Sequence, residues 1–204
     1  MDKLVKILIV LLIAVGLYYY IPTLSFGDKT VDDVPSPSFN KVFGRETVEV
    51  NGVKVDIKED YKCEVSGIVT FIEKYTDSDA ANKACPVDMI IAYGNAAKYN
   101  NKIDYECMLT RREAIISTGF SSVPAGVSEN DKALDQHLFC RLIPSNDDVR
   151  TQMLDLDEND YVKIVGMTGD ATFYNESGSA SSKFTTDTSG GTAVIYVISI
   201  TELD

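Results

Sequence analysis

The hydrophobic residues of the chain form one long run at the N-terminus, followed by shorter segments in which apolar and polar residues alternate. The run extends from Leu4 to Ile21, and Lys6 is its only charged residue. A helix of this length, at ~1.5 Å per residue, nearly spans the ~30 Å hydrocarbon layer of a membrane. Lys6 can extend its amine to the headgroups, and Pro22 ends the helix. We therefore predict a transmembrane anchor over residues 1–22, with residues 4–21 in the lipid bilayer.

The charges on either side of this run predict its orientation. Lys3 and Lys6 lie at its start, whereas Asp28, Asp32 and Asp33 follow it. By the positive-inside rule, the N-terminus stays in the cytoplasm. A cleaved signal peptide is the alternative, but the run is longer than a usual signal core and no small-x-small cleavage site follows it. We expect a single-pass protein of the cytoplasmic (inner) membrane, with its domain on the extracytoplasmic side.

A segment rich in Pro, Ser and Asp separates the anchor from the rest of the chain, with Val34–Pro37 at its centre. This composition favours an extended chain that holds a domain away from the bilayer. We therefore predict an extended linker over residues 23–44 and one extracytoplasmic domain over residues 45–204.

The domain contains many strand-like segments. The clearest is a hairpin over residues 48–55, in which alternating valines flank Asn51-Gly52, a dipeptide whose residues both adopt positive φ readily. Gly67 is expected to mark a bulge or a corner in the segment that follows. Further strands are expected at residues 61–75, 87–93, 136–143, 161–165 and 194–200. Residues 103–109 and 113–118 are two further strand candidates, for which the Ala and Arg content leaves a helix as the alternative.

Two other segments differ from this pattern. Residues 145–156 predict a helix, because Ser145 can cap it, acidic residues occupy its first turn, and Val149 and Met153 share one face. Residues 169–192 are dominated by Ser, Thr, Gly and Asp, which predicts a long hairpin loop that is either solvated or functional.

The order strand, strand, strand, helix, strand, strand resembles that of the OB-fold, whose helix joins the third and fourth barrel strands. Residues 65–69, 149–156 and 156–166 carry this resemblance, and the last is similar to the pattern L-x-x-G-D-x-V-x-I-x-G of many OB domains. Asn159 stands where glycine is usual, and asparagine tolerates the positive φ of that turn. The resemblance implies a mainly β, OB-like barrel with one helix before the penultimate strand, in addition to the transmembrane helix.

Four motifs carry a second resemblance, over roughly residues 61–203, and the first is an "S-G-x-V" strand at residues 66–69. Residues 86–94 are similar to a "P-V-D-(I/M)" strand that ends in glycine, residues 138–144 to an "N-x-H-x-I-P" segment, and residues 181–191 to an "S-S-x-x-R-x-D-T-G-x-G" segment. Together they resemble an uncharacterised bacterial family of membrane-anchored, exported proteins. Cys140-Arg141 stands where that family has Met-His. The resemblance implies an architecture and a location, and it implies no reaction.

Four cysteines lie beyond the anchor, and an even number in an extracytoplasmic domain predicts two disulfides, with three possible pairings. Four buried, reduced thiols are the first alternative, because cysteine is among the most buried residue types. A zinc site near His137 is the second, although no CxxC pair is present. The disulfide candidates are Cys63, Cys85, Cys107 and Cys140.

Few side chains of the domain are suited to catalysis. His137 is the only histidine, and Asp135 lies two residues before it, on the same face of a strand. Arg141 and Asp187 lie in the family-like motifs, so we group these four as a candidate site. Catalysis by a nucleophilic triad is not expected, because no nucleophile elbow accompanies the histidine.

No metal or cofactor is predicted. The alternating acidic run over residues 155–160 could bind calcium, but it lacks the glycine and the distal glutamate of an EF-hand loop. A formal net charge of −12 also makes binding to nucleic acid unfavourable, because such a surface repels phosphates.

The features together favour a membrane-tethered binding or assembly module without catalytic activity, whose partner is another envelope protein. The alternatives are an envelope enzyme that uses cysteine chemistry, and an OB-type module that binds an oligosaccharide or an oligonucleotide.

Overall fold

The computed structural model describes residues 30–102, 105–110, 112–118 and 136–204, so the predicted anchor lies outside the described residues. In the described part of the chain, no helix has the length and apolar character needed to cross a membrane. Strands account for most of this part, and they form one seven-stranded sheet and one two-stranded sheet. The prediction of a mainly β domain is confirmed.

The main sheet has the strand order β1-β2-β3-β6-β9-β7-β8, and the small sheet consists of β4 and β5. In chain order the strands are β1 (Ser38–Val50), β2 (Val53–Lys74), β3 (Val87–Ala92), β4 (Tyr105–Thr110), β5 (Glu113–Thr118), β6 (His137–Pro144), β7 (Tyr161–Tyr174), β8 (Ala180–Phe184) and β9 (Thr192–Leu203). The helical elements are α2 (Ala80–Ala84), α3 (Gly94–Lys98), the 3-10 turn η2 (Asn100–Lys102) and α4 (Asp147–Asp155).

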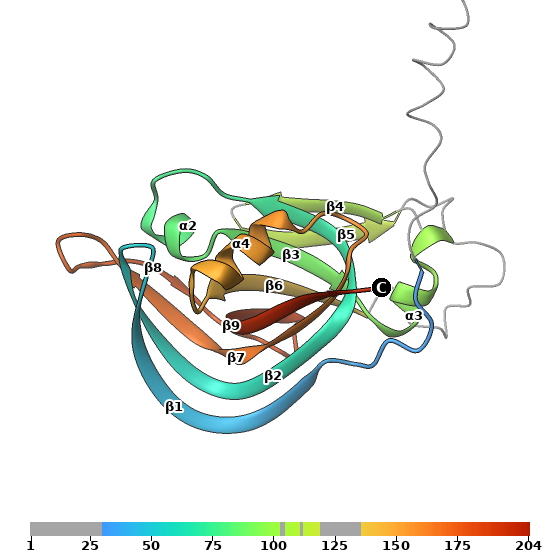
Figure 1. The fold of residues 1–204 in the computed structure, drawn as a ribbon, viewed down its shortest axis with the longest axis horizontal. Helices are drawn as coiled ribbons and strands as arrows, with labels where there is room; N and C mark the ends of the chain where they lie inside the picture. The colour runs from blue at the N-terminus through green and yellow to red at the C-terminus, as the bar shows by residue number, and fades with distance from the viewer. Residues whose placement is uncertain (1–29, 103–104, 111, 119–135) are drawn as a thin grey trace, which may run out of the picture.

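Five strands of the main sheet close into a ring, in the order β2, β3, β6, β9 and β7 (Figure 1). The ring closes because β2 is long enough to have two partners: its residues 55–68 pair with β7, and its residues 68–74 pair with β3. All neighbours in the ring are antiparallel except β6 and β9, which are parallel.

The N-terminal hairpin forms as predicted. Asn51 and Gly52 have φ of 51° and 74°, and Val50 pairs with Val53 across the turn. The strand before the turn is longer than predicted, since β1 begins at Ser38, inside the stretch predicted as an extended linker. The prediction missed this part of β1 because its residues are mostly exposed and show no apolar alternation.

The main core lies inside the ring and receives apolar side chains from all five ring strands, including Val65, Met89 and Ile164. Val149 and Met153 of α4 pack into this same core. The helix is confirmed close to its predicted range, but its cap is Asn146, whose side chain accepts a hydrogen bond from the Val149 amide at 2.9 Å.

The prediction of a loop over residues 169–192 is wrong for much of that stretch. β7 continues to Tyr174, and β8 pairs with it from Ala180 to Phe184. These strands were not predicted because small and polar residues fill most of their positions. In the structure, buried residues alternate with less buried ones along most of β7. Only the two turns within the stretch are loops.

The hairpin formed by β4 and β5 is separate from the main sheet, and β4 contacts β2 (Figure 1). Its register is regular, with Cys107 opposite Ile116 and Met108 opposite Ile115. No pairing in the described residues joins it to the main sheet, so side chains must hold it in place.

Gly67 lies in β2 one residue before this strand begins to pair with β3, and an added Cβ there would meet the Ala92 carbonyl and the Ile91 side chain. We expect Gly67→Ala to lower the free energy of unfolding by about 1–3 kcal/mol, because backbone atoms must move to relieve the contact. Thermal and denaturant unfolding measure this. Gly44→Ala is the control, since its new Cβ meets only the Glu59 side chain, which can rotate away. Equal stability of both variants would contradict the prediction.

Candidate functional site

A pocket of about 670 Å³ opens at the start of β6, and we call it the β6 pocket. Five parts of the chain form its walls: residues 36–39, Tyr93, two residues of β5, the start of β6, and residues 188–192. These segments are far apart in the sequence, and the ring brings them together. The lining residues are Ser36, Pro37, Phe39, Tyr93, Ala114, Ile116, His137, Leu138, Phe139, Thr188, Ser189, Gly190, Gly191 and Thr192.

Hydrogen bonds to one aspartate give the 188–192 wall its shape. The Asp187 carboxylate accepts hydrogen bonds from the Ser189 hydroxyl at 2.7 Å and from the Gly190 amide at 2.9 Å. These bonds lower the pKa of Asp187 from its usual value. The backbones of Asp187 and Thr192 bond to each other in both directions at 2.9 Å, and the Phe139 amide donates to the Gly191 carbonyl at 2.8 Å. The turn is therefore fixed both internally and against β6.

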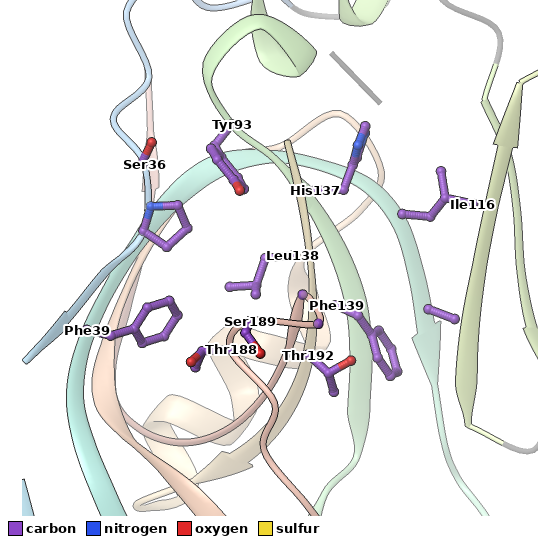
Figure 2. Close-up of a pocket in the computed structure, with 14 residues that line it drawn as sticks. Ser36, Phe39, Tyr93, Ile116, His137, Leu138, Phe139, Thr188, Ser189 and Thr192 are labelled. Atoms are coloured by element: carbon purple, nitrogen blue, oxygen red, sulfur yellow. The ribbon is translucent and has the colours of Figure 1, made fainter. Parts of the chain in front are cut away.

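Aromatic and hydroxyl groups dominate the inner surface of the pocket. Figure 2 shows Phe39 and Tyr93 on one side and Phe139 and Ile116 on the other, with the loop that carries Thr188 between them. No Asp, Glu, Lys or Arg is among the described lining residues. A pocket with this lining can hold an uncharged ligand by contact with ring faces and by hydrogen bonds to hydroxyl and backbone groups.

A second group of side chains lies farther along β6, and we call it the arginine cluster. It consists of Tyr75, Cys85, Asp88, Arg112, Arg141 and Phe184. At its centre Arg112 donates from Nε and Nη2 to the two carboxylate oxygens of Asp88, both at 2.9 Å. The Arg112 side chain is only 14% exposed and that of Asp88 is completely buried, so water screens this ion pair very little.

Other groups complete the contacts of this ion pair. Tyr75 donates its hydroxyl to Asp88 at 3.0 Å, and Arg112 also donates to the Cys85 carbonyl at 2.8 Å. The guanidinium of Arg112 lies 4.2 Å from the centre of the Tyr75 ring and 4.7 Å from that of Phe184. Burial raises the pKa of Asp88, and the charge and hydrogen bonds of Arg112 oppose this rise. Burial also raises the pKa of Tyr75, so its hydroxyl stays protonated as a donor.

The structure separates the predicted candidate residues. His137 lines the β6 pocket and Asp187 shapes one of its walls, so these two do lie at one site. Arg141 instead belongs to the arginine cluster, where it donates to the Arg112 carbonyl and lies 4.9 Å from the centre of the Phe184 ring. Asp135 lies outside the described residues.

Sequence reasoning missed the centre of the arginine cluster. Asp88 was visible as a carboxylate inside the apolar segment 87–93, and a buried charge in a strand requires a partner. The partner could not be identified, because Arg112 lies in a turn between two predicted strands and resembles an ordinary surface residue.

All four cysteines are free thiols in the structure, so the predicted disulfides find no support there. Burial raises the pKa of Cys63 and of Cys85 to about 12, and that of Cys107 to about 11. Burial also raises the pKa of Cys140 well above its usual value. These shifts are opposite to those of a nucleophilic cysteine, which needs a lowered pKa to form the thiolate.

The candidate metal sites are not assembled in the part of the chain that the structure describes. There, no group of three or more His, Cys, Asp or Glu side chains could hold a metal ion. In the acidic run, the Asp160 carboxylate accepts a hydrogen bond from the Asp157 amide at 2.7 Å, and Asp157 pairs with Lys74. Asn159 has φ of 74°, which is the positive φ expected where glycine is usual.

In comparisons with protein-family models, curated proteins and solved structures, the chain matches none of them.

The thiol pKa values predict slow alkylation of the native domain. At pH 8 we expect iodoacetamide to modify the cysteines at least about 100-fold more slowly than a free cysteine peptide, with Cys107 first because it is the least buried. Mass spectrometry after timed quenching measures the rates, and unfolding in denaturant should release all four thiols. One native thiol that reacts as fast as the peptide would contradict this and would revive the cysteine-enzyme hypothesis.

Proposed function

We propose that the chain is a membrane-tethered, extracytoplasmic binding or assembly module without catalytic activity, and that its ligand or partner binds in the β6 pocket. The observation that carries the proposal is the lining of this pocket, in which aromatic rings, hydroxyls and backbone groups converge and none of the described lining residues is Asp, Glu, Lys or Arg. The predicted anchor at residues 4–21 would hold the pocket near the outer surface of the cytoplasmic membrane.

We also infer that the five-stranded ring is an OB-type barrel. The ring strands β2, β3, β6, β7 and β9 would be barrel strands one to five, and α4 lies between the third and the fourth. OB-folds bind ligands on the face of strands two and three, next to the loop between strands four and five. The β6 pocket uses the third strand and residues 188–192 of that loop, which supports its assignment as the binding site. The resemblance to the exported, membrane-anchored family agrees with this proposal.

Charge limits the ligands that this module can bind. The chain has a formal net charge of −12, which disfavours phosphate-rich ligands such as nucleic acids. Among the described lining residues of the pocket, no charged side chain offers a counter-ion for a strongly charged group. An uncharged segment of an envelope protein fits best, and an uncharged oligosaccharide is the second candidate, because aromatic faces and hydroxyls suit both.

Photo-crosslinking in cells tests the pocket assignment. A benzophenone amino acid at Thr188, in the pocket wall, should crosslink to one or two envelope components, because its ring would lie where the partner binds. Mass spectrometry of the purified adducts identifies them. The same amino acid at Gln152, on the exposed side of α4, is the matched control and should give at least about tenfold fewer of these adducts. Equal, unspecific adducts at both positions would refute the proposal.

Removal of the predicted anchor tests the tether. A chain that lacks residues 1–22 should be recovered in the aqueous fraction, whereas the full chain should stay with the membranes after an alkaline carbonate wash, because its hydrophobic run is buried in lipid. Immunoblots of the two fractions measure this. Release of the full chain by carbonate would contradict the predicted anchor and leave the pocket assignment untouched.

A further inference from the structure

Arg112, in the turn of the β4–β5 hairpin, has an unusual number of partners in the main sheet, and Arg141 of β6 donates back to the Arg112 carbonyl. Arg112 comes from the turn of this hairpin, where its φ is 61°. The groups that receive its guanidinium are all outside the hairpin: the Asp88 carboxylate in β3, the Cys85 carbonyl, and the rings of Tyr75 and Phe184. The main sheet and its connections therefore form a recess around a guanidinium group, in which Nη1 of Arg112 alone is buried without a hydrogen-bond partner among the described residues.

The chemistry of this recess distinguishes a guanidinium from other cations. The two N–H groups of Arg112 reach both oxygens of Asp88 at equal distances, a fork geometry that the single nitrogen of a lysine cannot reproduce. The rings of Tyr75 and Phe184 add flat faces on which a planar cation stacks. Asp88 is already bonded by the Tyr75 hydroxyl, so its position does not depend on Arg112 alone.

The rest of the hairpin is weakly attached in the described structure. Its strands pair only with each other. Met108 and Ile115, which are opposite each other, remain 57% and 51% exposed on its outer face. Ala114 and Ile116, on the other face of β5, form part of the wall of the β6 pocket. Loss of the Arg112 side-chain contacts would therefore loosen the hairpin, which Arg141 also holds through the Arg112 carbonyl, and would change the shape of the pocket.

We propose that the recess of Tyr75, Cys85, Asp88 and Phe184 is a guanidinium-binding site, which Arg112 fills within the same chain and which an arginine side chain of a partner protein fills in its place. Because Arg112 is tethered to the recess, its effective concentration there is high. To displace Arg112, a partner must therefore also contact the surface that the hairpin covers. This site lies beyond the β6 pocket, so it stands independently of the proposed function.

Chemical complementation tests the recess in the full-length protein, purified in detergent. Arg112→Ala empties the recess and leaves the groups that form it. Methylguanidine at millimolar concentration should then bind, and at ten times its dissociation constant it should raise the melting temperature of the variant by about 4 °C. Differential scanning fluorimetry over a concentration series gives the affinity.

Three controls separate this site from a general effect of cations. Methylammonium should produce no shift in Arg112→Ala, because it lacks the fork of N–H donors. The double variant Asp88→Asn, Arg112→Ala should lose the response to methylguanidine. The unmodified chain should respond about tenfold more weakly than Arg112→Ala, because Arg112 competes for the recess.

Each result decides the proposal. A selective response that requires Asp88 supports it, and the same pattern with N-acetylarginine amide extends it to an arginine within a peptide. Equal effects of the two cations, or no effect on a folded variant, would overturn it. If Arg112→Ala fails to fold, refolding with methylguanidine should restore cooperative melting and refolding with methylammonium should not. Failure of both cations in that experiment also overturns the proposal.

Discussion

The pairing of one strand with two partners is the constraint on which the rest of the structure depends. β2 pairs with β7 along most of its length and then with β3, and this change of partner turns an open sheet into a ring. Gly67 permits the close approach of backbones at the change, because a side chain there would meet the Ala92 carbonyl. The ring encloses the main core, and it brings residues 36–39, Tyr93 and the 188–192 turn to the start of β6.

The same ring explains why a charge can be buried on β3. Asp88 lies in a strand whose six residues are all buried, and an isolated carboxylate there would lose its hydration without compensation. Arg112 supplies two of its hydrogen bonds and Tyr75 a third, so the Asp88 carboxylate is satisfied where it stands. The cost of leaving Asp88 without a partner makes the position of the small hairpin specific, although the ion pair itself adds little net stability.

Local sequence patterns predicted most of the helices and strands. They failed where a segment becomes a strand only through contacts with distant parts of the chain. The Asn51-Gly52 turn and the α4 helix follow from turn chemistry and helix periodicity, and both are present. Ser38–Gly44 and β8 are strands only because β2 and β7 offer free edges to them. At the candidate site, His137 and Asp187 were identified, but the partnership of Asp88 with Arg112 spans 24 residues and leaves no local pattern.

The place of β9 in the ring has a consequence for the order of events after synthesis. β9 is the last strand of the chain, and it lies between β6 and β7, parallel to the first and antiparallel to the second. The ring therefore stays open until residues 192–203 are available, and its closure must wait for contacts between distant parts of the chain. The other four ring strands are synthesised before β9, so their apolar faces remain without a closed core until β9 enters between β6 and β7.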